Sequence, residues 1–420
     1  MLPPQATAPT RLGDLIQSFG RIGLLSFGGP AAQISLMHDE IVTRRGWMSE
    51  DRFLGALSFA MLLPGPEAMQ LATYCGWRLR GVPGGLIAGG LFVLPGAAVI
   101  LALALAYAQF ADLTWVQAGF LGIKAAVIVI VLRALWTLAN KALKTRAHWL
   151  TALLAFVAMY AASVPFPLVI ALAALAGFAL DQSPAPREPA PHPGHGHLRR
   201  TLLIWGTLWA APLVLAWALG AAFLTEIGLF FSTLAVVTFG GAYAVLAYMT
   251  QTVVETHGWL DTAQMIDALG LAETTPGPLI LVTEFVGLLA GWLQGGLGLA
   301  LLAGAMTLWV TFIPCFLWVF AGAPYVEWLL AKPRLKGALA GISAAVVGVI
   351  LNLGLWFGLH VLFETVHDTA FGPLPDGASL SWPALGLTLL SALFILVFRL
   401  SIPLALALTS LAALGLQFLG

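Results

Sequence analysis

The sequence predicts an all-α integral membrane protein with about 13 transmembrane helices in two homologous halves. Of its 420 residues, 60% are hydrophobic and only 9% are charged, which is too few charged side chains to cover a soluble globule of this size. The segment 26–66 recurs at 238–278, where 14 of 41 positions are identical without gaps, and this indicates an internal duplication. Each copy ends in Pro-Gly-Pro within an apolar stretch, so each half should contain a broken helix.

The predicted spans fall on either side of a polar linker. Residues 181–200 are rich in proline, glycine and charge and cannot form a buried helix. We expect a first repeat at 1–180, a cytoplasmic linker at 181–200, an extra transmembrane helix at 201–223 and a second repeat at 224–420. The apolar spans, judged against the ~20 residues that cross a bilayer, are 12–37, 50–80, 83–110, 115–141, 148–164, 166–180, 201–223, 226–250, 261–292, 295–322, 336–363, 382–398 and 401–420.

The span count predicts that the two halves form an inverted repeat. Six spans precede the linker and six close the chain, and one extra crossing between them would insert the second copy upside down. A second alignment supports the equivalence of later spans, because GIKAAVIVIVL at 122–132 and GISAAVVGVIL at 341–351 share 6 of 11 positions.

The distribution of Lys and Arg predicts the orientation. With a cytoplasmic N-terminus and single crossings, 13 cations lie inside, and Arg44, Arg45 and Arg52 lie outside. If the broken segments are re-entrant hairpins, 11 cations lie inside and 5 lie outside. The positive-inside rule therefore favours single crossings and a C-terminus outside, and the hairpin alternative stays open.

Several classes of protein and site are not indicated. The sequence has no motif for hydrolytic or nucleotide chemistry, no basic patch for nucleic acid and no cofactor signature. Cys75 and Cys315 lie one in each half without metal or disulfide spacing, and we interpret both as core residues. The His-rich sequence at 192–197 is expected to be flexible linker rather than a metal site. The N-terminus lacks the pattern of a removed signal peptide.

Paired glycines interrupt an apolar helix in each half, at Phe-Gly-Gly. One interpretation is close helix packing of the small-residue kind. The other is exposed backbone that lines a cavity. The duplication and the neighbouring hydroxyls support this second interpretation, so that the two stand about level. The residues concerned are Ser26, Gly28, Gly29, Thr238, Gly240 and Gly241.

The Pro-Gly-Pro breaks are more specific. Each proline removes an amide hydrogen and blocks helix before it, so the chain should form two half-helices with unpaired amides at mid-membrane. Lipid cannot satisfy those groups, and a helix N-terminus suits an oxyanion. A kink capped by neighbours is the alternative. The predicted ligands here are Pro64, Gly65, Pro66, Gln70, Thr274, Thr275, Pro276, Gly277 and Pro278.

Charged residues within the spans are functional candidates by default. Lys124 lies near the centre of its span, and we expect it to face the anion, with an ion pair to Glu67 or another acid as the alternative. Arg133 lies about half a helical turn from Lys124 in projection, so the two should not share a pocket. The candidates for proton coupling are Glu67, Glu273 and Glu284.

The motifs FGGP at 27–30, PGPE at 64–67, GIKAA at 122–126 and TTPGP at 274–278 resemble those of the chromate ion transporter family in its long two-domain form. The resemblance covers nearly the whole chain. It implies a bacterial inner-membrane protein that exports chromate and confers resistance, with sulfate as the competing analogue and two halves of opposite orientation. It places the family pattern on Ser26, Gly28, Gly29, Pro64, Gly65, Pro66, Glu67, Gln70, Lys124, Gly240, Gly241, Pro276, Gly277 and Pro278.

The residues alone indicate an anion transporter driven by a proton or anion gradient. Two alternatives remain: a transporter of sulfate or another oxyanion, and a membrane receptor or scaffold that transports nothing. A homodimer in the bilayer is also compatible with the sequence.

Overall fold

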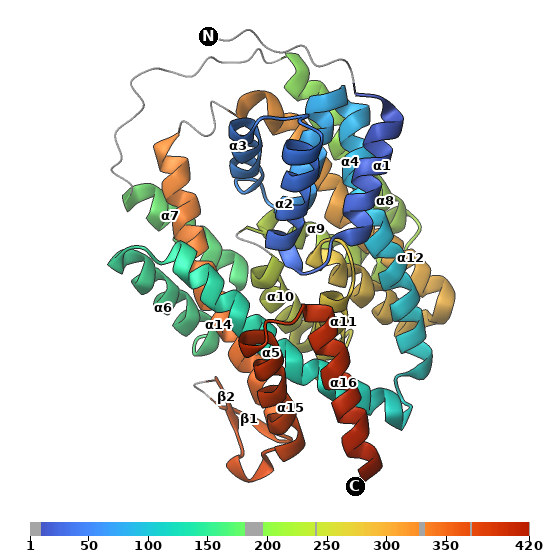
Figure 1. The fold of residues 1–420 in the computed structure, drawn as a ribbon, viewed down its shortest axis with the longest axis vertical. Helices are drawn as coiled ribbons and strands as arrows, with labels where there is room; N and C mark the ends of the chain where they lie inside the picture. The colour runs from blue at the N-terminus through green and yellow to red at the C-terminus, as the bar shows by residue number, and fades with distance from the viewer. Residues whose placement is uncertain (1–9, 181–195, 240–241, 327–331, 370–371, 420) are drawn as a thin grey trace.

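The computed structural model describes residues 10–180, 196–239, 242–326, 332–369 and 372–419. Most of the predicted linker, together with Gly240 and Gly241, lies outside these ranges. The described chain is almost entirely helical (Figure 1). The first half contains α1 (Leu12–Leu25), α2 (Gly29–His38), the π-helical η1 (Asp39–Arg44), α3 (Glu50–Ala60), α4 (Glu67–Phe110), α5 (Thr114–Ala142), α6 (Arg146–Tyr160) and α7 (Phe166–Leu180).

The second half repeats this order of elements after one further helix. Its elements are α8 (Gly196–Ala218), α9 (Ala222–Val237), α10 (Ala242–Gln251), η2 (Thr252–Thr256), α11 (Thr262–Thr274), η3 (Leu279–Leu281), α12 (Val282–Gly322), η4 (Ala323–Tyr325), α14 (Pro333–Leu362), β1 (Val366–Thr369), β2 (Gly372–Pro375), η5 (Gly377–Ser379), α15 (Trp382–Ala392), η6 (Leu393–Val397) and α16 (Ile402–Leu419). β1 and β2 form a short antiparallel pair.

The first predicted span, 12–37, is two helices rather than one, and this prediction is corrected. Gly28 and Gly29 adopt φ values of +86° and +79°, which an L-residue rarely adopts and which end α1. The chain then turns back, since Ser18 on α1 donates a hydrogen bond to Glu40 after α2, at 3.1 Å. At about 1.5 Å per residue, neither arm is long enough to cross a bilayer.

The first Pro-Gly-Pro break is also the tip of a hairpin. Phe59 on α3 and Tyr74 on α4 pack with ring centroids 5.6 Å apart, on opposite sides of the break. A second reversal follows at Arg80 and Gly81, where the backbone of α4 is not helical. The two arms there touch, because a methyl group on Gly76 would come within 2.3 Å of the Gly84 carbonyl oxygen. The interpretation of 50–80 as a single crossing is therefore wrong, and the predicted boundary before 83 is confirmed.

The second half folds by the same devices. His257 after α10 meets Glu226 on α9 at 2.9 Å, which makes a hairpin of these helices. α12 reverses at Gly295 and Gly296, where φ at Gly296 is +70° against +63° at Gly81. Equivalent breaks thus recur along both halves, as the duplicated sequence predicted.

By length and composition, five described helical stretches could cross a membrane. They are Glu67–Phe110, Thr114–Ala142, Leu198–Ala218, Leu279–Tyr325 and Arg334–Leu362, and four shorter apolar helices accompany them. The architecture is therefore that of an all-α membrane protein. The predicted total of about 13 crossings does not follow from it, because several predicted spans are arms of hairpins.

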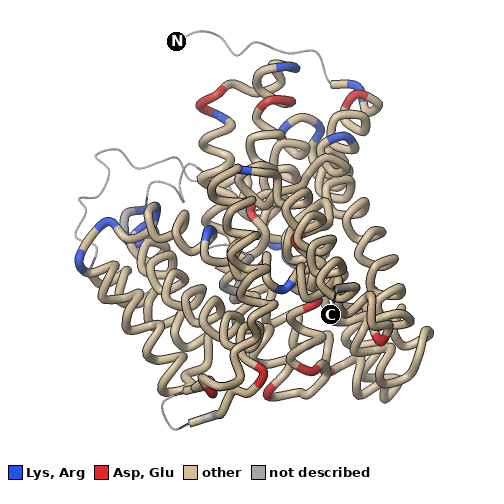
Figure 2. Tube along the Cα trace, turned by 60° about the horizontal axis from the view of Figure 1, so that its bottom comes forward, with Lys and Arg blue, Asp and Glu red and all other residues tan. Residues whose placement is uncertain are grey.

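Basic residues are distributed unevenly between the two ends of the molecule. Figure 2 shows acidic but no basic residues along its lower edge, whereas most basic residues lie towards the opposite end, together with further acidic ones. Arg80 donates a hydrogen bond to the Thr10 carbonyl oxygen at 2.7 Å, so the start of α1 and the reversal of α4 share one end. From that reversal α4 runs on to Phe110.

Candidate functional site

The four chain breaks of the two halves meet and are joined by a reciprocal pair of hydrogen bonds. The amide of Gly65 donates to the carbonyl oxygen of Thr238 at 2.8 Å. The amide of Gly277 donates to the carbonyl oxygen of Ser26 at 2.9 Å. Each Pro-Gly-Pro tip is thus bonded to the Phe-Gly-Gly break of the other half, and the two halves interlock at the centre.

These bonds change what the Pro-Gly-Pro tips can offer a ligand. The glycine amides, which the sequence predicted to be free, are taken by backbone carbonyls. Pro66, Pro276 and Pro278 are buried, and Pro64 is half-buried. Among the described residues at these tips, the first residues of the helices that follow still have amides without an intrahelical acceptor.

The polar side chains at the tips are also largely occupied. Gln33, which the sequence analysis did not select, donates to the carbonyl oxygens of Gly277 at 2.7 Å and Ser26 at 3.3 Å. Gln70 donates to the Pro64 carbonyl oxygen at 2.6 Å, and its own Oε1 has no partner in the described chain. The hydroxyls of Ser26, Thr238, Thr274 and Thr275 bond to carbonyl oxygens one turn back on their own helices.

Lys124 forms an ion pair that joins the two halves. Its Nζ lies 3.1 Å from Oδ1 of Asp267 on α11. Tyr107 donates its hydroxyl to Oδ2 of the same carboxylate at 2.8 Å. All three side chains are largely shielded from solvent. The sequence predicts an ion pair with Glu67 or another acid as the alternative role of Lys124. It contains no local signal that identifies Asp267 or Tyr107 as the partners.

The three candidate proton carriers occupy different surroundings. Glu273 accepts a hydrogen bond from the Tyr243 hydroxyl at 2.8 Å. Glu284 is 3% exposed, and its Oε2 has no partner among the described residues. Glu67 begins α4 directly after the first Pro-Gly-Pro and is half-buried. Of the three, Glu284 is the carboxyl group that the described protein leaves unsatisfied.

A cavity of about 610 Å³ opens beside the first Phe-Gly-Gly break. Phe27, Gly28 and Ala32 line it from the break, and Arg133 and Arg399 line it from α5 and from the link before α16. The structure therefore places Arg133 and Lys124 in different surroundings, as their spacing predicted. Arg399 is not among the site residues predicted from the sequence, and the signal for it is an arginine in the short link before the apolar helix α16.

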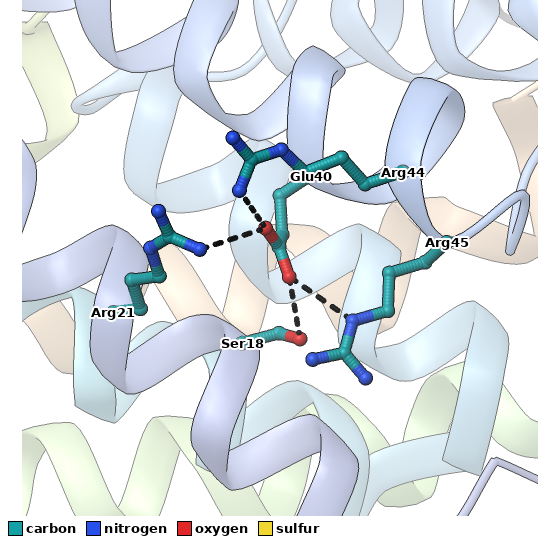
Figure 3. A network of polar contacts seen from close by, with 5 residues as sticks. All are labelled: Ser18, Arg21, Glu40, Arg44 and Arg45. Carbon is teal, nitrogen blue, oxygen red and sulfur yellow. Dashed lines mark hydrogen bonds and ion pairs between the residues drawn. The ribbon is translucent and has the colours of Figure 1, made fainter.

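A separate cluster of polar side chains holds the first hairpin together at the end away from its Phe-Gly-Gly turn. Figure 3 shows the carboxylate of Glu40 between Arg21, Arg44, Arg45 and Ser18, with Arg45 Nε at 3.0 Å. Burial would raise the pKa of Glu40, but hydrogen bonds from Arg45 and Ser18 and the charges of Arg45 and Arg21 outweigh it, so the pKa lies below its ordinary value. This network of ion pairs therefore holds the segment after α2 against α1.

These features define the class of the protein: an all-α, multi-pass membrane protein whose interrupted helices meet at its centre. The family model described as chromate transporter matches residues 13–178 and 225–416. The chain belongs to the chromate transporter family, as the motifs predicted.

Named relatives cover most of the chain. It is 33% identical over 355 residues to the chromate transport protein of Cupriavidus metallidurans, a match that covers 82% of each chain. It is 31% identical to the probable chromate transport protein of Synechococcus elongatus, over 85% of this chain and 86% of that one. It is 32% identical to the chromate transport protein of Pseudomonas aeruginosa, over 83% and 80%. No solved structure matches the chain.

Proposed function

We propose that this protein is a secondary transporter that carries chromate out of the bacterial cell across the inner membrane and so confers resistance. The substrate is supported by the family and by relatives named chromate transport proteins. The mechanism rests on one observation, the reciprocal hydrogen bonds between the breaks of the two halves. Interrupted helices that meet at the centre of a duplicated membrane protein are typical of transporters with alternating access.

We further propose that the halves are an inverted repeat. The swapped bonds of Gly65 with Thr238 and of Gly277 with Ser26 are what a two-fold relation within the membrane plane would produce. The unmatched helix α8 lies between the halves, so an even number of crossings in the first half would still leave the second half inverted. The number stays even because two predicted crossings of the first half, 12–37 and 50–80, are both hairpins that return to their own side.

The charge separation supports a cytoplasmic N-terminus and a periplasmic C-terminus. The end of the molecule with the start of α1 and the reversal of α4 carries most cations. The hairpin of α1 and α2 brings Arg44 and Arg45 back beside α1, because both contact Glu40, which contacts Ser18 and Arg21. The other end carries acidic but no basic residues along its edge. The positive-inside rule then places the basic end in the cytoplasm.

The direction follows from the charge of the substrate. The free energy of a dianion falls by about 4.6 kcal/mol per 100 mV of membrane potential when it leaves an inside-negative cell. Inward proton flow through Glu284, Glu273 or Glu67, or exchange for another anion, would add to this driving force. We place the substrate path along the central breaks, beside Ser26, Gly28, Gly29, Pro64, Gly65, Pro66, Gln70, Lys124, Thr238, Gly240, Gly241, Thr274, Thr275, Pro276, Gly277 and Pro278.

The test is counterflow in proteoliposomes. Purified protein is reconstituted into vesicles loaded with unlabelled chromate, and uptake of labelled chromate or labelled sulfate is followed with and without an imposed pH gradient. We expect protein-dependent chromate counterflow that exceeds sulfate counterflow. Sulfate flux without chromate flux would favour a sulfate transporter, and no flux of either anion would favour a receptor or scaffold.

A further inference from the structure

Two arginines face one cavity without an acidic partner. Arg133 and Arg399 both line the cavity of about 610 Å³ beside Gly28. Neither guanidinium forms an ion pair with any residue in the described part of the chain. The rest of the lining is largely apolar, including Phe27, Ile402 and Pro403. Both arginines are exposed in the protein, and within a membrane two like charges against an apolar lining are costly unless an anion or water meets them.

Helix packing holds the two arginines together. Ala126, Val129 and Ile130 on α5 form a buried cluster with Ile395, Ala405 and Leu406 from η6 and α16. This contact fixes α5 against the link that carries Arg399. That link has a constrained backbone, because Arg399 adopts a φ of +52° although it is not glycine. Arg133 is therefore presented by a packed helix, and Arg399 by a short link whose two flanking elements pack on that helix.

The start of α2 adds a third favourable element. Gly28, with φ of +86°, turns the chain so that α2 begins at the cavity, and Ala32 in its first turn lines the wall. The first amides of a helix have no intrahelical acceptor and carry partial positive charge. Pro30 supplies none of them, so the amides of Gly29 and Ala31 are the available donors.

A second cavity at the related place in the other half has a different character. It has a volume of about 540 Å³ and is lined by Ser163 and Asn352. Asn352 is the residue that follows the aligned segment 341–351, as Arg133 follows 122–132. Ser163 and Arg399 are the described non-glycine residues with positive φ, and each joins the last two helices of its half. The two cations are therefore specific to one of two related cavities.

We propose that the cavity beside Gly28 binds one free tetrahedral oxyanion, with Arg133 and Arg399 as its ligands and the first amides of α2 as further donors. A cavity of this volume is in the range of small-molecule sites, and guanidinium forks match the paired oxygens of such an anion. Lys124, which is already paired with Asp267, is not a ligand there. The substrate named here rests on the proposed function, but anion binding can be tested without transport.

The experiment measures binding and transport side by side. Equilibrium dialysis with labelled sulfate and labelled chromate is carried out on full-length protein in detergent without added lipid. The variants are Arg133→Gln, Arg399→Gln, Arg133→Lys and Arg399→Lys. Arg334→Gln is the matched control, because Arg334 stacks on Phe178 away from the cavity and loses the same charge. Monodispersity and helix content establish that each variant is folded.

We expect each Gln variant to weaken oxyanion binding about 10- to 100-fold, the loss expected for one charge-assisted contact. The Lys variants should keep part of the affinity, since they keep the charge without the fork, and Arg334→Gln should bind as the wild type does. Unchanged affinity in both Gln variants would overturn the proposal. So would displacement of sulfate by phosphatidylglycerol at a few equivalents, because the arginines would then serve a lipid headgroup.

Transport by the same preparations separates this inference from the proposed function. If the wild type binds sulfate through the arginines but moves no chromate in vesicles, the anion site stands and the transport function fails. If the wild type moves chromate and both Gln variants retain its KM, the function stands and the assigned site is wrong.

Discussion

The backbone amide of Gly277 lies 2.9 Å from the carbonyl oxygen of Ser26 and donates a hydrogen bond to it. The two residues are in different halves of the chain, and Gly65 makes the matching bond to Thr238. Because both bonds use backbone atoms, they survive most side-chain changes. They depend instead on the left-handed backbone of the two glycines, with φ of +87° at Gly277 and +121° at Gly65.

Substitution of either glycine should therefore loosen the centre of the protein. A methyl group on Gly65 would lie 2.8 Å from Gln70 Nε2 and 3.0 Å from Cys315 Sγ, besides straining the backbone. We expect Gly65→Ala and Gly277→Ala each to reduce stability by about 1–3 kcal/mol and to slow transport. Thermal unfolding in detergent and vesicle flux measure the two effects. Gly119→Ala is the control, since a methyl group there meets no atom within 4 Å, and an equal loss in it would contradict the argument.

The Lys124 and Asp267 pair predicts non-additive effects of mutation. Removing one partner of a buried ion pair leaves an uncompensated charge and costs about 3–5 kcal/mol. We expect Lys124→Met and Asp267→Asn each to destabilise the protein strongly, and the double variant to recover much of the loss. Unfolding measurements on the complete cycle report this coupling.

The same cycle distinguishes a structural from a substrate-binding role of Lys124. If the lysine only pairs with Asp267, the double variant should regain a near-wild-type KM for chromate. A KM that stays high in the double variant while stability recovers would show that Lys124 contacts the anion.

Glu40 should make the stability of the first hairpin depend on pH. Its folded pKa is depressed from 4.5 by Arg45, Ser18 and Arg21. The stabilisation is therefore present above about pH 4.5 and lost as the pH falls through the folded pKa. We expect wild type to exceed Glu40→Gln in unfolding temperature at pH 7, with the gap closing below pH 4. A gap that stays constant between pH 7 and pH 3 would refute this assignment.

Glu284 is the candidate proton carrier whose Oε2 has no partner among the described residues. A buried carboxyl group with no cation or donor is costly in its ionised form, so we expect it to exchange a proton when its surroundings change. We expect Glu284→Gln to keep chromate counterflow but to lose acceleration by a pH gradient. Glu273→Gln is the comparison, because the Tyr243 hydroxyl already satisfies that carboxylate. Full response to the gradient in Glu284→Gln would exclude it as the coupling group.

The sequence by itself determined the class of the protein, its duplication and the places where its helices break. Apolar composition requires a membrane, and the Phe-Gly-Gly sequence at 27–29 and the two Pro-Gly-Pro sequences interrupt helices through effects that act within a few residues. The family also followed from local motifs, as the match to residues 13–178 and 225–416 bears out.

Only the tertiary structure decided how the broken segments return and which charges meet. A break has the same sequence whether the chain crosses or turns back, and the choice depends on contacts such as Phe59 with Tyr74. Lys124 pairs with Asp267 in the other half, and Arg133 and Arg399 line one cavity although they come from different halves. Partners so far apart along the chain leave no local pattern, because they are chosen by how whole helices pack.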